Sequence, residues 1–185
     1  MKKLSLLLLL LLPACHHDEV VSNKYSSLPA RFTFTPVNSI SQLLTACNSM
    51  GQWCAIYPDM TNRIVHFALA DGKNPGQANL TAVDGYTGFN WGTGNGYLVG
   101  LPNVPEVGET EAVVTCFDRS CRNCYEEATV TRTLELREAG QAYCARCQRT
   151  YNLNNSGIVA SGKAGNPLYR YRVYYGNNTL SINNQ

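Results

Sequence analysis

The apolar residues of this chain fall mostly in short runs, several of which alternate with polar positions. The segment Arg31–Thr35 alternates polar and aromatic residues and ends at Pro36, which is the pattern of a half-buried strand. Similar runs predict further strands at Cys54–Tyr57, Arg63–Leu69, Tyr97–Val99, Ala112–Phe117, Val130–Leu136, Ala142–Cys144, Leu168–Tyr175 and Thr179–Ile182. Many short strands separated by Gly and Asn turns predict an all-β fold, either a small antiparallel barrel or a sandwich.

The remaining segments predict turns, loops and little helix. Ile40–Cys47 fits one or two helical turns that end before Gly51, and Asp71–Asn79 is rich in turn residues. Gly85–Gly96 contains several aromatic residues and is expected to be a loop between strands. Glu138–Gln141 is expected to turn a hairpin. No helix is expected after Cys124 or Cys147.

The N-terminus carries the pattern of an exported protein. Two lysines precede the apolar run Leu4–Leu12, which is too short to span a bilayer. The following Leu12-Pro13-Ala14-Cys15 resembles a bacterial lipoprotein signal, whose cleavage leaves a lipid on the new N-terminal cysteine. This resemblance predicts a signal peptide over 1–14, lipid on Cys15, a tether over 15–28 and one β domain over 29–185. The alternatives are an ordinary secretory signal and a short anchor that is not removed.

The compartment follows from the same resemblance. His16, and not Asp, follows Cys15, which by likeness to lipoproteins of diderm bacteria favours the outer membrane. Removing Lys2 and Lys3 from 15 basic residues leaves 13 against 13 acidic ones, so the processed chain is neutral. A neutral chain lacks the basic excess that nucleic-acid binding requires. The expected partners are the membrane, through the lipid, and an unidentified protein.

Two Cys-x-x-Cys motifs carry the clearest chemistry. Cys121 and Cys124 form the first, and Cys144 and Cys147 form the second after an interval of nineteen residues. Each motif can turn two sulfurs toward one point, and two such knuckles complete a tetrahedral four-sulfur site. The spacing is typical of a zinc ribbon and predicts a two-knuckle metal-binding subdomain over 114–153.

The order of motifs around these knuckles resembles the Rieske iron–sulfur domain. The first knuckle is followed by a hairpin, the second knuckle, Gly157-Ile158-Val159 and a closing Pro-Leu strand from Pro167. The resemblance implies a Rieske-like barrel in which Cys121 and Cys144 match the two family cysteines. A Rieske site also needs two histidines. Asn123 and Cys147 stand at those positions, so the family's cluster chemistry does not carry over.

Three readings of the four cysteines remain open. Zinc with four thiolates is structural, and an unfolded exported chain can acquire it after crossing the membrane. Iron, as a single ion or as a [2Fe–2S] cluster, would make the protein an electron carrier of the envelope. Oxidation in that compartment would instead give a metal-free, disulfide-stapled domain. Zinc is favoured, in a binding or accessory module that is not an enzyme.

Three other cysteines lie in the predicted domain. Cys47 and Cys54 flank a loop with turn residues, and a disulfide between them is predicted. Cys116 has no assigned role. The lone domain histidine, His66, lies on a predicted strand and is interpreted as a structural residue. Arg119, Arg122, Arg146 and Arg149 bracket the knuckles, where nearby acidic residues make the surface mixed in charge.

Overall fold

The computed structural model describes residues 24–80 and 89–184, and this part of the chain is mostly antiparallel β. The predicted leader, Cys15 and most of the predicted tether lie outside these residues. Among the described residues, none of the helices has the length and apolar character needed to cross a membrane.

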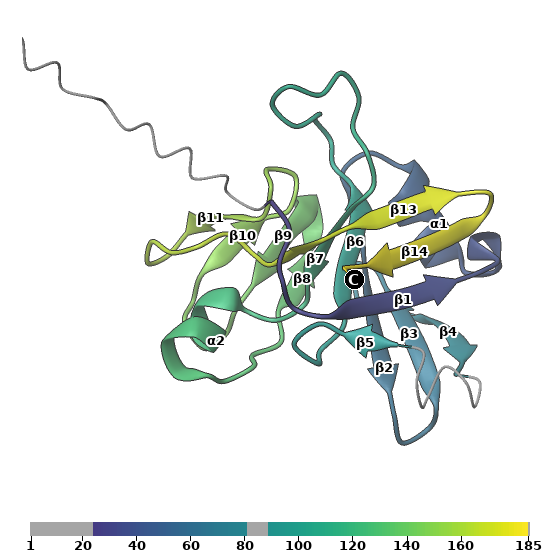
Figure 1. The fold of residues 1–185 in the computed structure, drawn as a ribbon, viewed down its shortest axis with the longest axis horizontal. Coiled ribbons are helices and arrows are strands. Elements are labelled where there is room, and N and C mark those ends of the chain that lie inside the picture. The colour runs from purple at the N-terminus through teal and green to yellow at the C-terminus, as the bar shows by residue number, and fades with distance from the viewer. Residues whose placement is uncertain (1–23, 81–88, 185) are drawn as a thin grey trace, which may run out of the picture.

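The described strands form three sheets (Figure 1). The first has the order β13-β14-β1-β5, with bounds Val173–Gly176, Thr179–Asn183, Ala30–Phe34 and Asn90–Trp91. The second has the order β12-β7-β6-β2-β3-β4, with bounds Arg170–Tyr171, Thr115–Asp118, Tyr97–Leu101, Gln52–Asp59, Ile64–Ala68 and Gly76–Asn79. The third has the order β11-β10-β9-β8, with bounds Ile158–Ser161, Thr150–Asn152, Gln141–Tyr143 and Glu135–Arg137.

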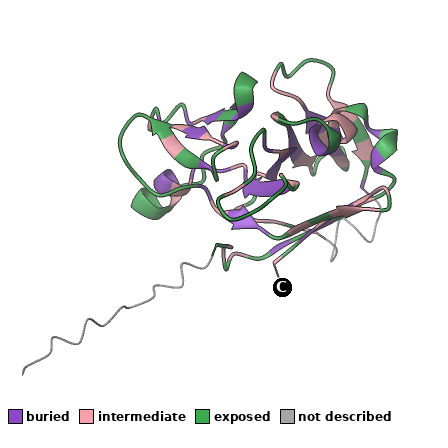
Figure 2. Ribbon diagram, turned by 90° about the horizontal axis from the view of Figure 1, so that it is seen from above, coloured by how far each residue is buried: buried purple, intermediate pink, exposed green. Residues whose placement is uncertain are grey.

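The six-stranded sheet lies between two hydrophobic cores because its central strands are apolar on both faces. In β6, Tyr97 and Val99 enter the core shared with the β1 sheet, whereas Leu98 between them enters the core shared with the β8–β11 sheet. In β7, Cys116 and Phe117 divide in the same way. Successive side chains of a strand point to opposite faces, so an uninterrupted apolar run serves both cores. Figure 2 shows the buried positions gathered on these inner strands.

Most predicted strands are present, but several segments differ from the prediction. Val130–Leu136 is a strand only at its end, because β8 is Glu135–Arg137, and β5 and β11 form where no strand is predicted. Leu168–Tyr175 is not one strand: β12 joins the six-stranded sheet, β13 joins the first sheet, and Arg172 lies between them. One apolar stretch thus connects two layers. The predicted turn region Asp71–Asn79 ends in β4, which pairs with β3 as an edge strand. Its sequence, Gly-Gln-Ala-Asn, lacks the β-branched and aromatic residues that would signal a strand.

Two short α-helices accompany the sheets. The first, α1 (Ser41–Asn48), matches the predicted helical turns and buries Leu43, Ala46 and Cys47 against the larger core. The second, α2 (Arg122–Ala128), begins immediately after Cys121 and corrects the expectation that no helix follows the first knuckle. It is short and no side chain caps its N-terminus, and Thr129 ends it in a left-handed conformation with φ 55°. Its sequence therefore lacks the usual start and stop signals. The described residues also contain two 3-10 turns, η1 (Val37–Ser39) and η3 (Glu138–Gly140).

The segment that carries the two Cys-x-x-Cys motifs is an insertion between two paired strands of the larger body. Strand β12 pairs with β7, with Arg170 opposite Phe117 and Tyr171 opposite Cys116. The chain between them forms α2, the β8–β11 sheet and the connecting loops, which lie together at one end of the molecule (Figure 1). The predicted hairpin is present, with β8 and β9 joined through η3. This arrangement returns the second knuckle to the side of the first.

Candidate metal centre

The four predicted cysteines converge on one point. The sulfur atoms of Cys121, Cys124, Cys144 and Cys147 all lie within 4.8 Å of one another. Cys121 Sγ is 3.6 Å from Cys147 Sγ, and Cys124 Sγ is 3.7 Å from Cys144 Sγ. A zinc ion with sulfur ligands at about 2.3 Å places neighbouring sulfurs about 3.8 Å apart in a tetrahedron. The prediction that both knuckles share one site is therefore confirmed, and the site has dimensions that fit one metal ion.

The first knuckle is built by the start of α2. Cys121 is the residue that precedes the helix and its backbone N–H donates to Arg132 O at 2.8 Å, which ties it to the chain entering the hairpin. The carbonyl of Cys121 accepts the Tyr125 N–H at 3.1 Å. One turn of helix thus sets Cys124 beside Cys121, and the backbone N–H of Cys124 points to the Cys121 sulfur.

The second knuckle is a tight turn closed by Gln148. The Gln148 N–H donates to Cys144 O at 2.8 Å, and Gln148 itself adopts a left-handed φ of 58°. The Cys144 N–H donates to Arg149 O at 3.0 Å, so the turn closes into the strand that follows. A residue other than glycine rarely takes this φ. Gln148 therefore has a mildly strained backbone conformation directly after the ligand candidate Cys147.

The surroundings shift the pKa values of three of these thiols in different directions. Burial raises the pKa of Cys121 to about 11 and also raises the pKa of Cys124. Burial opposes ionisation of Cys147 too, but the backbone N–H and guanidinium of Arg149 outweigh it and lower the Cys147 pKa to about 7. The first knuckle therefore lacks the lowered thiol pKa that a thioredoxin-like redox motif uses, although a helix follows Cys121.

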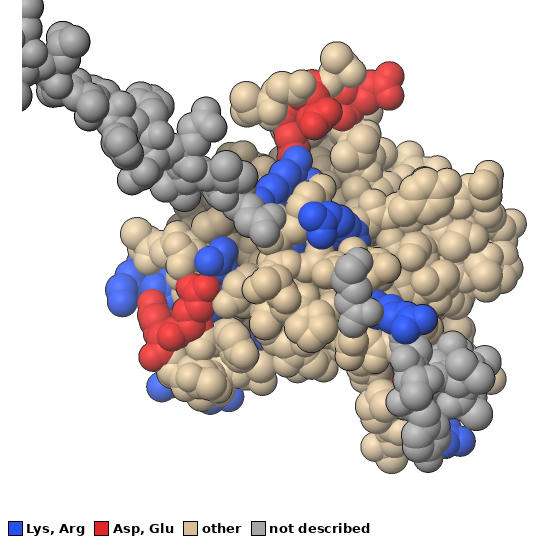
Figure 3. Space-filling view, in the orientation of Figure 1, with Lys and Arg blue, Asp and Glu red and all other residues tan. Residues whose placement is uncertain are grey.

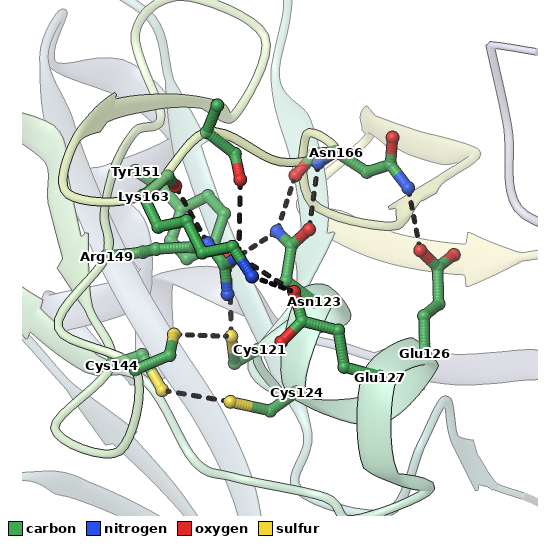
Figure 4. A network of polar contacts seen from close by, with 12 residues as sticks. Cys121, Asn123, Cys124, Glu126, Glu127, Cys144, Arg149, Tyr151, Lys163 and Asn166 are labelled. Atoms are coloured by element: carbon green, nitrogen blue, oxygen red, sulfur yellow. Dashed lines mark hydrogen bonds and ion pairs between the residues drawn. The ribbon is translucent and has the colours of Figure 1, made fainter.

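Two polar side chains contact the site from behind Cys121 (Figure 4). The Tyr151 hydroxyl lies 3.1 Å from Cys121 Sγ, and Asn123 Nδ2 donates to Tyr151 Oη at 2.9 Å. Since Tyr151 Oη accepts from Asn123, its own proton is free to point at the sulfur. Both side chains are buried, Tyr151 completely. Asn123, which stands at a Rieske histidine position, thus supports a ligand and is not itself in the sulfur cluster.

A buried arginine contacts the other side of the site. Arg149 is only 1% exposed, and its guanidinium helps to lower the pKa of the nearby Cys147 thiol. It also donates to Lys163 O at 2.9 Å, to Ala164 O at 3.2 Å and to Glu127 Oε1 at 2.8 Å. Four thiolates around a divalent ion carry a net charge of about −2. Arg149 places a positive charge where such a site needs one.

The four arginines that bracket the knuckles have different roles. Arg119 lies over the Tyr57 ring at 4.1 Å from its centroid, and Arg122 pairs with Glu126 across one turn of α2. Arg149 is buried as described, and Arg146 is exposed. Figure 3 shows acidic and basic side chains mixed at this end of the molecule, with a second acidic group on the loop that projects between β6 and β7. The prediction of a surface mixed in charge agrees with these pairings.

A buried carboxylate anchors the strand that leads to the first knuckle. Asp118 accepts hydrogen bonds from the Thr93 N–H and hydroxyl at 2.8 Å each, from the Ser120 N–H at 2.7 Å and from Tyr171 Oη at 2.7 Å. Burial raises the pKa of Asp118, and the four donors act against that rise. Gly92 approaches so closely that a Cβ there would lie 2.3 Å from Asp118 Oδ2. The network joins the 92–95 turn to the residue before Cys121.

The three other cysteines in the described part of the chain lie in the larger core and not in the four-cysteine cluster. Cys47 on α1 and Cys54 on β2 are both buried thiols that interact electrostatically, and the disulfide between them stays a prediction. Cys116 is completely buried on the same face of the six-stranded sheet. His66 stacks on Tyr57 at a centroid distance of 5.1 Å, which agrees with a structural role. Phe89 and Trp91 pack against the larger core, but Asn90–Trp91 form strand β5 and pair with β1, so the described part of the predicted loop Gly85–Gly96 contains a short strand.

Sequence reasoning found the four sulfurs but missed the residues that surround them. The sequence assigns Tyr151 no role and treats Asn123 only as a substituted ligand. It places Arg149 among the charges of a mixed surface, yet Arg149 is buried. Their positions in the sequence could have indicated two of these residues. Asn123 lies inside the first knuckle, and Arg149 lies two residues after the second knuckle. Side chains so close to ligands are those expected to contact metal-bound sulfur.

Comparison of the chain with family models, with curated proteins and with solved structures gives no significant match.

Proposed function

We propose that Cys121, Cys124, Cys144 and Cys147 bind one zinc ion that holds the β8–β11 sheet and α2 together. The observation that carries this proposal is the sulfur geometry, with pairs at 3.6 and 3.7 Å across the two knuckles. These separations approach the edge of a zinc–sulfur tetrahedron and greatly exceed a disulfide bond of about 2.05 Å. With four protein ligands the ion has no open position, so its role is structural.

The same sulfur–sulfur distances also help to choose between the two iron alternatives. A [2Fe–2S] cluster places two cysteines on each of two irons, so the two pairs stand apart by the width of the cluster. Here all four sulfurs lie within 4.8 Å of one another, which favours a single ion. A single iron with four thiolates needs the same tetrahedron as zinc, and it is the second candidate, in which the protein is an electron carrier of the envelope.

The proposed setting is a Rieske-like domain in a lipoprotein of the cell envelope. Support for the Rieske likeness is the insertion of a two-knuckle unit between paired strands β7 and β12 of a larger β body. Support for the anchor is the leader pattern that ends at Cys15. In this setting the domain acts as a binding or accessory module near the outer membrane. The ion stabilises the end of the domain formed by the β8–β11 sheet and α2.

Metal content tests the proposal directly. Protein purified under reducing conditions should be colourless and contain one zinc per chain, and Cys147→Ser should lower zinc content and thermal stability together. An iron absorption spectrum that bleaches on reduction would favour the electron carrier. Absence of metal with all four thiols oxidised would favour the disulfide alternative. The anchor is tested separately: Cys15→Ala should release the protein from the membrane fraction.

A further inference from the structure

The loop after β11 lies against the metal centre and is exposed along its whole length. Residues 162–167, which we call the metal-end loop, have the sequence Gly-Lys-Ala-Gly-Asn-Pro and carry no buried side chain. A loop without apolar burial needs other contacts to hold one conformation, because ordering each residue costs conformational entropy of about 1–2 kcal/mol. Those contacts come from residues that also support the four cysteines.

The first connection runs from the Cys121 sulfur. Tyr151 Oη contacts that sulfur and accepts a hydrogen bond from Asn123, as described above. Asn123 then clamps the loop backbone: Nδ2 donates to Asn166 O at 2.9 Å, and Oδ1 accepts the Asn166 N–H at 2.9 Å. Gly165 allows this approach, since a Cβ there would lie 2.3 Å from Asn123 Oδ1. The contact therefore continues from sulfur to loop through two buried side chains.

The second connection runs from the Cys147 sulfur. Arg149 follows Cys147 by two residues, favours the thiolate form of that sulfur, and donates to the carbonyls of Lys163 and Ala164 in the same loop. Figure 4 shows Asn123 and Arg149 between the sulfurs and the loop residues Lys163 and Asn166. The two ends of the loop are thus held by residues of two different knuckles, and an ion bound by all four sulfurs would fix the position of one knuckle relative to the other.

The far end of the loop also forms part of a cavity. Arg122 donates to Pro167 O at 3.4 Å, and Glu126 accepts the Asn166 side-chain N–H at 2.7 Å, so α2 and the loop are joined. Arg122, Glu126 and Pro167 line one wall of a cavity of about 770 Å³. Residues 24–28 and Glu106 line the opposite side. A movement of the loop or of α2 would change the shape of this cavity.

We infer that the bound metal controls the metal-end loop: occupancy fixes the loop and the cavity wall, and loss of the ion frees both while the two larger sheets stay folded. The inference rests on the proposed metal site and extends it to a regulated surface. Without the ion, the knuckles are no longer joined through their sulfurs, and Asn123 and Arg149 lose the fixed positions from which they hold the loop. The body keeps its own core, which contains none of the four ligands.

Hydrogen exchange read by mass spectrometry tests this inference on the whole domain. Metal-loaded protein is compared with protein treated with a chelator and a thiol reductant, and metal content is measured in both samples. The Asn166 N–H, read from overlapping peptides that cover 162–167, should exchange at least about tenfold faster after metal removal, because it loses its acceptor on Asn123. Peptides from β1 and β14, in the first sheet, should not change.

A variant separates the loop contact from the ion itself. Gly165→Ala keeps all four ligands and the side chains that contact them, so it should bind one metal per chain. Its Cβ would lie 2.3 Å from Asn123 Oδ1 and push the loop off that side chain, so loop exchange should be fast even when the protein is loaded. Asn38→Ala is the control, since Asn38 is exposed on η1, away from the site, and should behave as the parent. If the protein binds no metal, the proposed function and this inference both fail. If metal binds and loop exchange is the same with and without it, or if removal unfolds the first sheet as well, only the inference is overturned.

Discussion

Replacing Tyr151 by Phe removes one hydroxyl from the metal centre and leaves the ring in place. Tyr151 is completely buried, and its hydroxyl lies 3.1 Å from Cys121 Sγ. In the metal-bound form that sulfur is a thiolate, and a hydrogen bond to a charged group contributes about 1.5–3 kcal/mol. At about 1.4 kcal/mol per tenfold, zinc affinity should fall by about 10- to 100-fold. Losses of this size are typical of residues that support metal ligands.

The same change has a second cost that does not depend on the metal. Asn123 Nδ2 donates to both Tyr151 Oη and Asn166 O, so the variant leaves one of its two buried N–H groups without an acceptor. That loss should lower the free energy of unfolding by about 1–3 kcal/mol with or without zinc. The two effects can be measured separately. Zinc affinity reports the contact between Tyr151 and the Cys121 sulfur, whereas the stability of the metal-free protein reports the unpaired N–H of the Asn123 side chain.

Competition with a chelator of known zinc affinity measures the first effect, in the presence of a thiol reductant. Tyr143→Phe is the control, because Tyr143 is half-buried on β9 and its ring faces the Arg137 guanidinium, 3.8 Å from the centroid. The control should bind zinc as the parent does. Zinc affinity of Tyr151→Phe within about twofold of the parent would refute the reasoning, since a bond of this strength could not then exist in the bound form.

Three further predictions concern the body of the domain. Gly92→Ala should lose about 1–3 kcal/mol more stability than Gly72→Ala in chemical denaturation, because both glycines have nearly the same positive φ (63° and 61°) but only the Gly92 Cβ would collide with Asp118. Equal losses of stability in the two variants would show that the strain of the positive φ, and not the collision with Asp118, sets the cost of the substitution. Cys116→Ser should lower thermal stability by about 1–3 kcal/mol, since it places a hydroxyl in an apolar core, and metal analysis should find the zinc content unchanged. Burial raises the pKa of Glu106, but its two cationic partners outweigh this and lower it. Its carboxylate therefore stabilises the fold above about pH 4.3, and this contribution is lost as the pH falls through the lowered value. Glu106→Gln should accordingly be less stable than the parent at pH 7 in urea titrations, with a difference that shrinks in acid; a constant difference would contradict the assignment.

The sequence predicted the β class and most strand positions because alternation and apolar runs report burial directly. It could not predict that Leu168–Tyr175 would divide between two sheets, since the break at Arg172 depends on how the layers are arranged. Strand β4 and helix α2 were missed for a different reason. Each is held in place by its neighbours, β4 by pairing with β3 and α2 by the cysteines at its start, and neither has strong local propensity.

The candidate site was predictable at the level of its ligands and not beyond. Two Cys-x-x-Cys motifs at suitable spacing specify four sulfurs, and the hairpin between them explains why they meet. The contacts of Tyr151, Asn123 and Arg149 depend on side chains that are separated along the chain and come together only through the fold. Arg149 is the clearest example, since a single charged residue near a knuckle gives no indication that it is buried or that it contacts the metal-end loop.

Mass spectrometry under native and denaturing conditions tests the central claim most directly, because the difference between the two masses gives the bound ion whatever lipid the chain carries. The account predicts a difference of one zinc ion per chain, corrected for the protons released from the ligands, and a denatured chain with all four thiols reduced. A chain of the same mass under both conditions, lacking four hydrogens because two disulfides have formed among Cys121, Cys124, Cys144 and Cys147, would contradict it.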